Sequence, residues 1–197
     1  TWVNTTGLVA LYHLNNDSSV GENTTRVYDF SGMQNNGSCG GSICPFVNNT
    51  GKIRRGYSFD GSDYINVTHT SSMNGSSQFT ISFWMIKPVD NINQQVYFIK
   101  GNVFNNLTWM IQKKNSDGTV GVVYIATSLG DYNTLGETPT GSMPENAWFN
   151  FISVFNGSGS TNADRLKIYI NGVEKTLSFT GTIPSIILNT THPLLIG

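Results

Sequence analysis

Short runs of β-branched and aromatic residues recur along the whole chain, separated by clusters of Gly, Asn, Asp and Ser. Apolar and polar residues alternate within most runs, as in a strand with one buried face, and helical periodicity is almost absent. Asp60-Gly61 and Asn171-Gly172 are typical hairpin dipeptides, because a type I′ turn needs φ > 0 at both central positions. We therefore predict an all-β chain with strands over residues 8–14, 54–59, 64–68, 79–86, 95–100, 107–113, 120–126, 148–155, 166–170, 173–179 and 194–196.

Strands at this spacing favour two antiparallel sheets packed face to face. The run 79–86 carries large apolar side chains on both faces, which indicates a central strand, whereas 166–170 has one polar face. Residues 127–146 show no periodicity, and a loop of this length is usually functional, so we expect a variable rim loop there. With no internal repeat and no linker, residues 1–197 are predicted to form one domain, a two-sheet antiparallel jelly-roll sandwich.

The low charge of the chain excludes several partners. Eleven Lys and Arg stand against 12 Asp and Glu, so the formal net charge is -1 and only 12% of residues are charged. Soluble domains average about 25%. Such a chain has no electrostatic footprint for nucleic acid or anionic lipid. Hydrophobic residues make up 38%, which argues against disorder, and no apolar run approaches the roughly 20 residues of a spanning helix. We expect no nucleic-acid partner and no membrane insertion.

Acceptor motifs for N-glycosylation are unusually frequent. Ten of the 23 asparagines begin an Asn-x-Ser/Thr sequence, about twice the number expected by chance in this composition. An Asn- and Thr-rich composition alone is the alternative explanation. The ten predicted glycosylation sites are Asn4, Asn16, Asn23, Asn36, Asn48, Asn66, Asn74, Asn106, Asn156 and Asn189.

The only two cysteines, Cys39 and Cys44, stand in the sequence CGGSIC, where the glycines allow the chain to turn back sharply. We predict a disulfide between them. A redox CxxC motif would need a shorter spacing, and a zinc site would need further ligands, whereas His69 is the nearest histidine. A disulfide implies an oxidising compartment, so we expect an extracellular or cell-surface protein.

Catalytic motifs are missing from the sequence. A glycoside hydrolase needs two carboxylates about 5 to 9.5 Å apart, yet no glutamate has a second acid two or four positions away on a predicted strand. Asp60 and Asp63 flank a turn, where Asp is favoured for local hydrogen bonds. No nucleophile-elbow, P-loop or dinucleotide-binding motif is present. We therefore expect no enzyme activity. The four glutamates are Glu22, Glu137, Glu145 and Glu174.

Calcium is the one metal that the composition permits. Residues 27–37 supply Asp29, Gln34, Asn35 and Asn36 in a glycine-containing stretch, and calcium prefers such oxygen ligands. The residues alone leave open both a calcium site and an ion-free loop of Asx turns.

The order of the motifs resembles the concanavalin A-like lectin/glucanase superfamily, and more closely its LamG-like jelly-roll modules of archaeal-type secreted or surface proteins. The resemblance runs nearly end to end. The segments that carry it are GLVALYHLNND from Gly7, VYDFSGMQNNGS from Val27, GKIRRGYSFDGSDYINV from Gly51, FTISFWMIKP from Phe79, LKIYINGV from Leu166 and PLLIG from Pro193.

This resemblance implies a concanavalin A-like sandwich, no catalysis in most members, and often one structural calcium near an edge. Asp29 in the D-S-G loop and Asp60 in the FDG turn are the metal candidates that it points to. Family members normally continue beyond the IG motif with another strand, whereas this sequence ends at Gly197. We expect either one module of a longer extracellular protein or a missing edge strand supplied by a neighbour.

Our leading hypothesis is a non-catalytic recognition or adhesion module that binds a glycan or a surface protein through its rim loops. The alternative is a structural subunit of a glycosylated surface layer or filament that self-associates through an open sheet edge. A glycoside hydrolase is the third hypothesis. Asp131 and Tyr132 in the long loop are the candidate ligand-binding residues, because an aromatic face beside a carboxylate suits a sugar ring. An ordinary solvated loop tip is the other interpretation of this pair.

Overall fold

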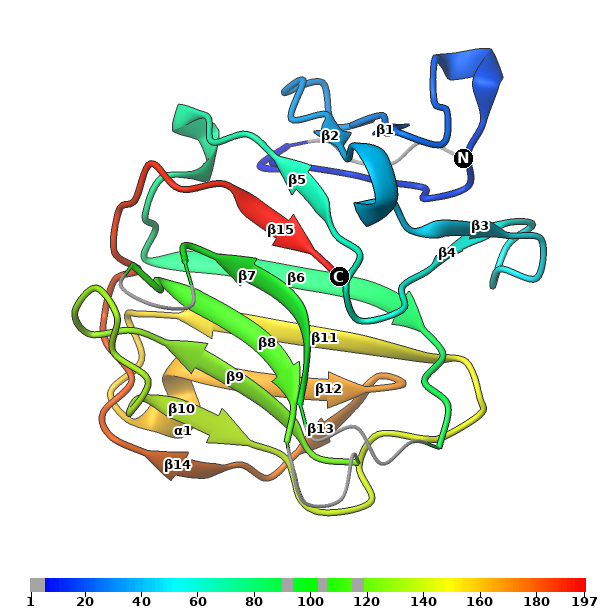
Figure 1. Cartoon of the computed structure of the whole chain (residues 1–197). Helices are drawn as coiled ribbons and strands as arrows, with labels where there is room; N and C mark the ends of the chain where they lie inside the picture. The colour runs from blue at the N-terminus through cyan, green and yellow to red at the C-terminus, as the bar shows by residue number, and fades with distance from the viewer. Residues whose placement is uncertain (1–5, 90–93, 103–105, 115–118) are drawn as a thin grey trace. The chain divides into compact units, whose positions relative to one another are not determined.

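The structure, a computed structural model, describes residues 6–89, 94–102, 106–114 and 119–197 and consists mainly of antiparallel strands (Figure 1). The chain divides into two compact units, each described by itself below. The first unit comprises residues 1–74 and 191–197, and the second comprises residues 75–190. That the two together act as one domain stays a prediction. Asn4, a predicted glycosylation site, lies outside the described residues.

The second unit is a sandwich of two antiparallel sheets. One sheet has the strand order β7-β8-β9-β10-β14, and the other has the order β13-β12-β11-β6 (Figure 1). The strands are β6 (Gln78–Met85), β7 (Gln95–Lys100), β8 (Trp109–Lys113), β9 (Gly121–Ile125), β10 (Leu135–Glu137), β11 (Phe149–Asn156), β12 (Leu166–Ile170), β13 (Val173–Lys175) and β14 (Ser178–Thr180). The predicted all-β antiparallel sandwich is thereby confirmed.

Aromatic side chains fill the space between these two sheets. Along β11 buried and half-buried residues alternate, and Phe149, Phe151 and Phe155 are at most 1% exposed. Phe151 lies opposite Phe83 of β6, and the two rings stack with their centroids 5.3 Å apart. Burying each such ring contributes roughly 1.5 to 3 kcal/mol, so the alternation itself fixes the register of β11.

The first unit has a smaller sheet and a separate hairpin. Its sheet follows the order β1-β2-β5-β15, and β3 pairs with β4. The close fit of Gly37 to Ile65 and Val27 explains the glycine, because a Cβ at position 37 would lie 2.5 Å from Ile65 Cγ2. The strands are β1 (Arg26–Val27), β2 (Gly37–Ser38), β3 (Phe46–Asn48), β4 (Gly56–Ser58), β5 (Ile65–Val67) and β15 (Leu194–Ile196), and 3-10 turns lie at Ser18–Val20, Gly41–Ile43 and Ser71–Met73.

The predicted strand over residues 8–14 is wrong, because this segment forms irregular backbone. The two backbone hydrogen bonds of Leu11 go to residues 29 and 30. Its N–H donates to Asp29 Oδ1, and its carbonyl accepts from the N–H of Phe30. Leu14 has φ 52°, a left-handed conformation that ends an extended run. The side chain of Asp29 thus takes the hydrogen bond that a neighbouring strand would provide.

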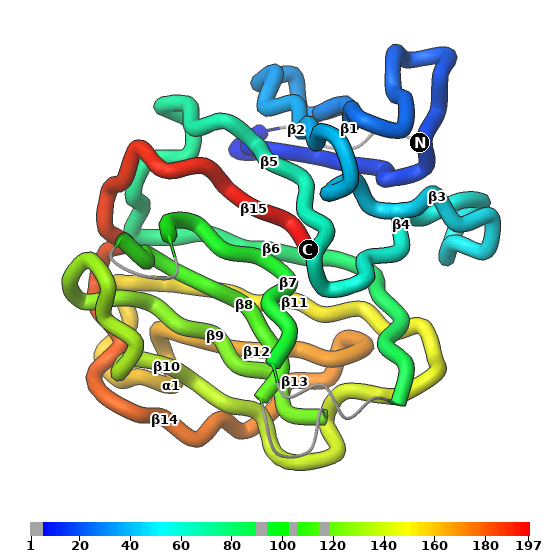
Figure 2. The backbone as a smooth tube through the Cα atoms, in the orientation of Figure 1, coloured from blue at the N-terminus to red at the C-terminus, as the bar shows by residue number. Residues whose placement is uncertain are grey.

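Other elements also differ from the prediction, and the strands β1, β2 and β3 were not expected at all. The expected strand 173–179 is two strands, because the chain leaves one sheet after β13, which pairs with β12, and enters the other as β14, which pairs with β10 (Figure 2). The loop expected over 127–146 contains β10. Alternation alone could not detect the change of sheet, since both pieces keep a strand-like pattern.

Sequence reasoning also missed the helical turn α1 (Asn162–Arg165). The Thr161 side chain accepts from the N–H of Asp164, and the Asp164 carboxylate accepts from the N–H of Thr161. This reciprocal capping box was visible as a Thr-x-x-Asp sequence. No helix among the described residues is long and apolar enough to cross a membrane.

Candidate functional site

A cluster of polar side chains lies on β8, β9 and β10, on the sheet face that points away from the core. Side chains alternate between the two faces of a strand. Ile111 and Val123 belong to the core, so Gln112 and Tyr124 lie on the opposite face. The register places Tyr124 beside Leu135 of β10. We call five residues the outer-face cluster: Gln112, Lys114, Tyr124, Tyr132 and Glu137.

Tyr124 is at the centre of this cluster. Gln112 Nε2 donates to the Tyr124 hydroxyl at 3.1 Å, although Gln112 itself is only 4% exposed. The ring of Tyr132, from the loop that follows β9, meets the Tyr124 ring edge-on with centroids 6.2 Å apart. Burial, and next the Glu137 carboxylate, raise the pKa of Tyr124, so its hydroxyl stays protonated and neutral. The result is two aromatic rings with a fixed amide beside them.

An ion pair borders the same face. Lys114 Nζ lies 2.9 and 2.7 Å from the two carboxylate oxygens of Glu137. Both side chains are partly open to solvent, 45% for Lys114 and 23% for Glu137. Val120 and Val122 form a small apolar group with Leu135 in contact with Tyr124. These three apolar residues and Gln112 are buried, at most 8% exposed, so the groups that reach solvent on this face are the half-buried Tyr124 and Tyr132 rings, the Lys114 ammonium and the Glu137 carboxylate. Aromatic rings beside charged groups suit a polar ligand with an apolar side.

The structure separates the two residues predicted to bind ligand. Tyr132 joins the outer-face cluster, whereas the Asp131 carboxylate turns into its own loop. Its Oδ2 accepts from Thr127 and Thr134, and its Oδ1 accepts from the N–H of Asn133 at 2.7 Å. Burial alone would raise the pKa of the Asp131 carboxyl, but these donors together lower it to about 2. Asp131 is thus a loop-ordering carboxylate that places Tyr132.

Asp29, the first metal candidate, holds the loop that replaces the expected first strand. Oδ1 accepts from the N–H groups of Leu11 and Ser31, both at 2.8 Å. Oδ2 accepts from the Ser31 hydroxyl at 2.7 Å and from the N–H of Asn35 at 2.9 Å. With Asp29 only 2% exposed and four donors on its two oxygens, the arrangement does not fit a calcium ligand.

Asp60, the second candidate, is exposed and forms an Asx turn in which Oδ1 accepts from the N–H and hydroxyl of Ser62. Among the described residues, no group of three or more His, Cys, Asp or Glu could hold a metal. The Oδ1 atoms of Asn15 and Asn16 differ, because both are buried without a donor in the described structure. We derive no chemistry through a metal.

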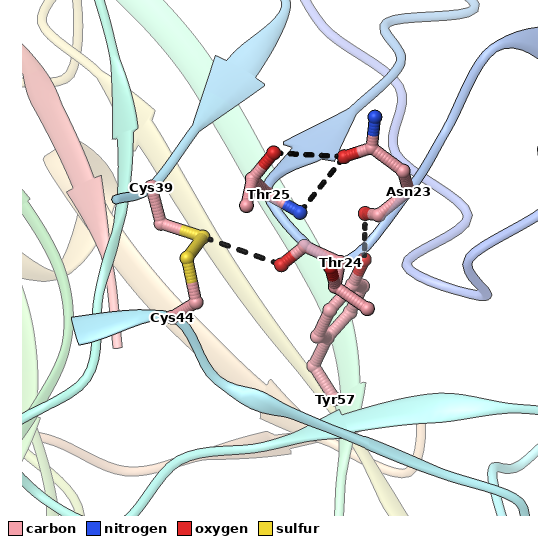
Figure 3. The surroundings of a disulfide bond; sticks show 6 residues. All are labelled: Asn23, Thr24, Thr25, Cys39, Cys44 and Tyr57. Atoms are coloured by element: carbon pink, nitrogen blue, oxygen red, sulfur yellow. Dashed lines mark hydrogen bonds between the residues drawn. A yellow bond between two sulfur atoms is a disulfide. The ribbon is translucent and has the colours of Figure 1, made fainter. Parts of the chain in front are cut away.

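Cys39 and Cys44 form the predicted disulfide, with Cα atoms 5.1 Å apart (Figure 3). Cys39 Sγ lies 3.6 Å from the carbonyl oxygen of Thr24, and Tyr57 donates its hydroxyl to the carbonyl of Asn23 at 3.3 Å. A shallow surface depression lies beside these residues, and it encloses essentially no volume that a water molecule could occupy, so we assign no ligand to it.

Residues 59–197 match the family model described as the concanavalin A-like lectin/glucanases superfamily. The match covers most of the chain, and the chain belongs to this superfamily. The resemblance proposed from the ordered sequence motifs is thereby confirmed. No curated protein sequence matches the chain.

Three solved structures are similar in fold. The binding domain of botulinum neurotoxin DC, solved in complex with SialylT, has 18% identity and a TM-score of 0.53, and the match covers 96% of this chain and 43% of that one. A heptameric SAP-like pentraxin from Limulus polyphemus has 18% identity and a TM-score of 0.44, with 63% and 53% covered. The carbohydrate-binding module CBM66 from Bacillus subtilis has 11% identity and a TM-score of 0.39, with 78% and 88% covered. The chain thus spans about half the length of the toxin domain and the pentraxin.

Sequence reasoning found Tyr132 and missed the other four residues of the outer-face cluster. A signal was present, because Gln112 alternates with core-facing Ile111 in β8, which Lys114 follows directly, and Tyr124 and Glu137 alternate with core-facing residues in β9 and β10. The register that brings these strands together depends on long-range pairing, which alternation does not specify.

Proposed function

We propose that this protein is a non-catalytic recognition module that binds glycan on the outer face of β8, β9 and β10. The observation that carries the proposal is the contact between Gln112, Tyr124 and Tyr132, which holds an amide and two aromatic rings in one place. The superfamily includes lectins, and the binding domain of the toxin was solved with SialylT, which makes a glycan the first ligand class to test.

The chemistry of a sugar matches this surface. A pyranose has an apolar side formed by C–H groups, which can lie against an aromatic ring, and hydroxyls at its rim that need donors and acceptors. Tyr132 offers the ring, and Lys114 and Glu137 offer charged groups that remain partly exposed. Because Gln112 and Tyr124 already hydrogen-bond to each other, the protein loses little side-chain freedom on binding.

The absence of catalysis is also a proposal, and the contacts of the glutamates support it. Hydrolysis of a glycosidic bond needs two carboxylates with different protonation states flanking the bond. In this chain every glutamate already has a structural contact. Glu22 accepts from the N–H groups of Asp17 and Tyr28, Glu137 binds Lys114, Glu145 binds Lys87, and Glu174 binds Lys167 and Tyr169.

The disulfide supports an extracytoplasmic location, because such bonds persist in oxidising compartments. We further propose that the module acts at the cell surface or outside the cell, where glycans are displayed. Surface proteins are the second class of partner. Self-association through a sheet edge remains the competing proposal, and it predicts oligomers without a free ligand.

A glycan array probed with the purified protein tests the proposal, once with millimolar calcium and once with chelator. We expect specific signal on a restricted set of glycans and no hydrolysis of the bound sugars by mass spectrometry. Turnover that disappears when a single glutamate is changed to Gln would show an enzyme instead. Silence on the array combined with concentration-dependent oligomers in analytical ultracentrifugation would support the assembly subunit.

A further inference from the structure

Three of the described glycosylation motifs share one local geometry. In each, the asparagine Oδ1 accepts hydrogen bonds from both the N–H and the hydroxyl of the residue two positions later. Thr25 bonds to Asn23 in this way at 2.9 Å for both contacts, and Thr50 bonds to Asn48 at 2.9 and 2.7 Å. Ser158 bonds to Asn156, and these contacts are 3.3 and 2.7 Å long.

This geometry fixes the direction of the carboxamide. Because Oδ1 is held toward the turn, Nδ2 on the same planar group must point to the other side. Figure 3 shows Asn23 Nδ2 pointing away from Thr25, while Oδ1 faces it. All three residues of the Asn23 motif are exposed, and so are all three of the Asn48 motif. Their amide nitrogens are therefore presented to an enzyme without any change of the fold.

Asn156 is less available than the other two. It is half-buried at the end of β11, and its Oδ1 accepts a further hydrogen bond of 3.1 Å from Gln78 Nε2 on β6. Modification at this position would have to move a side chain that connects two neighbouring strands.

The carboxamide oxygens of three further motifs have different surroundings. Asn36 Oδ1 accepts from the N–H of Asp29 at 2.9 Å, and Asn189 Oδ1 accepts from the N–H of Gly75. Asn16 Oδ1 is buried. Asn16 and Asn36 are half-buried, and the exposed Asn189 is tied to a distant segment rather than to its own turn.

In the remaining three described motifs the asparagine lies in a strand that is paired on both sides, or the hydroxyl donates elsewhere. Asn66 lies in β5, which pairs with β2 on one side and β15 on the other. Asn48 differs, because it is the last residue of β3 and its motif continues into exposed residues outside the strand. After Asn74, the hydroxyl of Ser76 donates to the carbonyl of Gln78 at 2.7 Å. After Asn106, the fully buried Thr108 donates its hydroxyl to Lys100 O.

We propose that Asn23 and Asn48 are the preferred acceptors for N-linked glycan transfer to the folded protein. The donor class is an oligosaccharide joined through phosphate to a polyprenyl lipid. Asn Nδ2 attacks the anomeric carbon, the C–O bond to the lipid phosphate breaks, and the phosphate leaves with the electron pair of that bond. Nδ2 loses one proton to a base of the transferase, so the product is a neutral N-glycosyl amide.

The test is transfer in vitro by a single-subunit oligosaccharyltransferase that accepts Asn-x-Ser/Thr, with lipid-linked oligosaccharide as donor. The native full chain and the reduced, denatured chain are compared, and glycopeptide mass spectrometry gives the rate at each asparagine. We expect Asn23 and Asn48 to react at least tenfold faster than the other described motifs in the native chain. This preference should disappear in the denatured chain.

Matched variants keep the test independent of folding. Asn23→Gln with Asn48→Gln should remove most transfer to the native chain, whereas Asn36→Gln should change it little, and circular dichroism checks that each variant folds. Three results overturn the proposal: equal rates at all described motifs in the native chain, faster transfer at any other described motif, or a denatured chain that is modified while the native chain is not.

Discussion

Gln112 and Tyr124 lie on neighbouring strands, and the 3.1 Å hydrogen bond from Gln112 Nε2 to the Tyr124 hydroxyl joins them on the face opposite the core. Since Gln112 is 4% exposed, its amide cannot exchange this partner for water without cost. The bond keeps the Tyr124 ring in the position where Tyr132 meets it.

Tyr124→Phe should lower the free energy of unfolding by about 1 to 2 kcal/mol, because a buried amide N–H loses its acceptor. Changing Gln112→Met as well should recover part of the loss, since both polar partners are then removed. Urea denaturation of the two single variants and the double variant measures the coupling. Strict additivity of the two changes would show that the bond contributes nothing.

The contribution of the ionised Asp131 carboxylate to the free energy of unfolding should depend on pH. Its pKa in the folded protein is about 2, below the ordinary value of 3.8, so its contribution is present above about pH 4 and is lost as the pH falls through 2. Screening by solvent limits that contribution to under about 1 kcal/mol. Asp131→Asn should flatten the stability profile between pH 4 and 2. An unchanged slope would contradict this role.

Lys87 and Glu145 form an ion pair of 2.6 Å in which the lysine side chain is only 1% exposed. Glu145→Gln should cost about 2 kcal/mol, less than for a fully buried pair because Glu145 is 29% exposed. Glu174→Gln provides the control, since its pair with Lys167 is open to solvent and should change stability by under about 0.5 kcal/mol. Thermal unfolding measures the loss of stability in each variant. Similar losses would show that the buried pair contributes no more to stability than the exposed pair.

The disulfide closes a loop with a sequence separation of only five residues. The chain-entropy model assigns such a bond about 2 kcal/mol. Cys39→Ser with Cys44→Ser should therefore lower the melting temperature of the first unit, while glycan binding should persist, because the outer-face cluster belongs to the second unit. Loss of binding in a variant that stays folded would place the ligand elsewhere.

Alternation was sufficient to predict the long strands of the second unit, because strands such as β11 bury every second residue around a single core. They failed at residues 8–14, where the Asp29 side chain replaces a neighbouring strand. They also failed after Lys175, where the chain changes sheets without a change of pattern. In both places a long-range partner decides the local structure.

The candidate site was harder to predict than the fold. Tyr132 was identified as an aromatic residue in a long loop, and the paired Asp131 was expected to face the same ligand. The hydrogen bonds of Asp131 to its own loop could not be predicted, because Asp is favoured in turns and a carboxylate can also bind a ligand, so the residue type alone does not decide between the two roles.

The most direct test of the central claim is a glycan-array comparison of the natural chain with Tyr132→Ala and with Tyr169→Ala. Tyr169 lies on β12 in the other sheet of the same unit and serves as the matched control. The account predicts specific signal for the natural chain and for Tyr169→Ala, and at least a tenfold loss for Tyr132→Ala. Full signal from a folded Tyr132→Ala variant, or no signal from the natural chain, would contradict it.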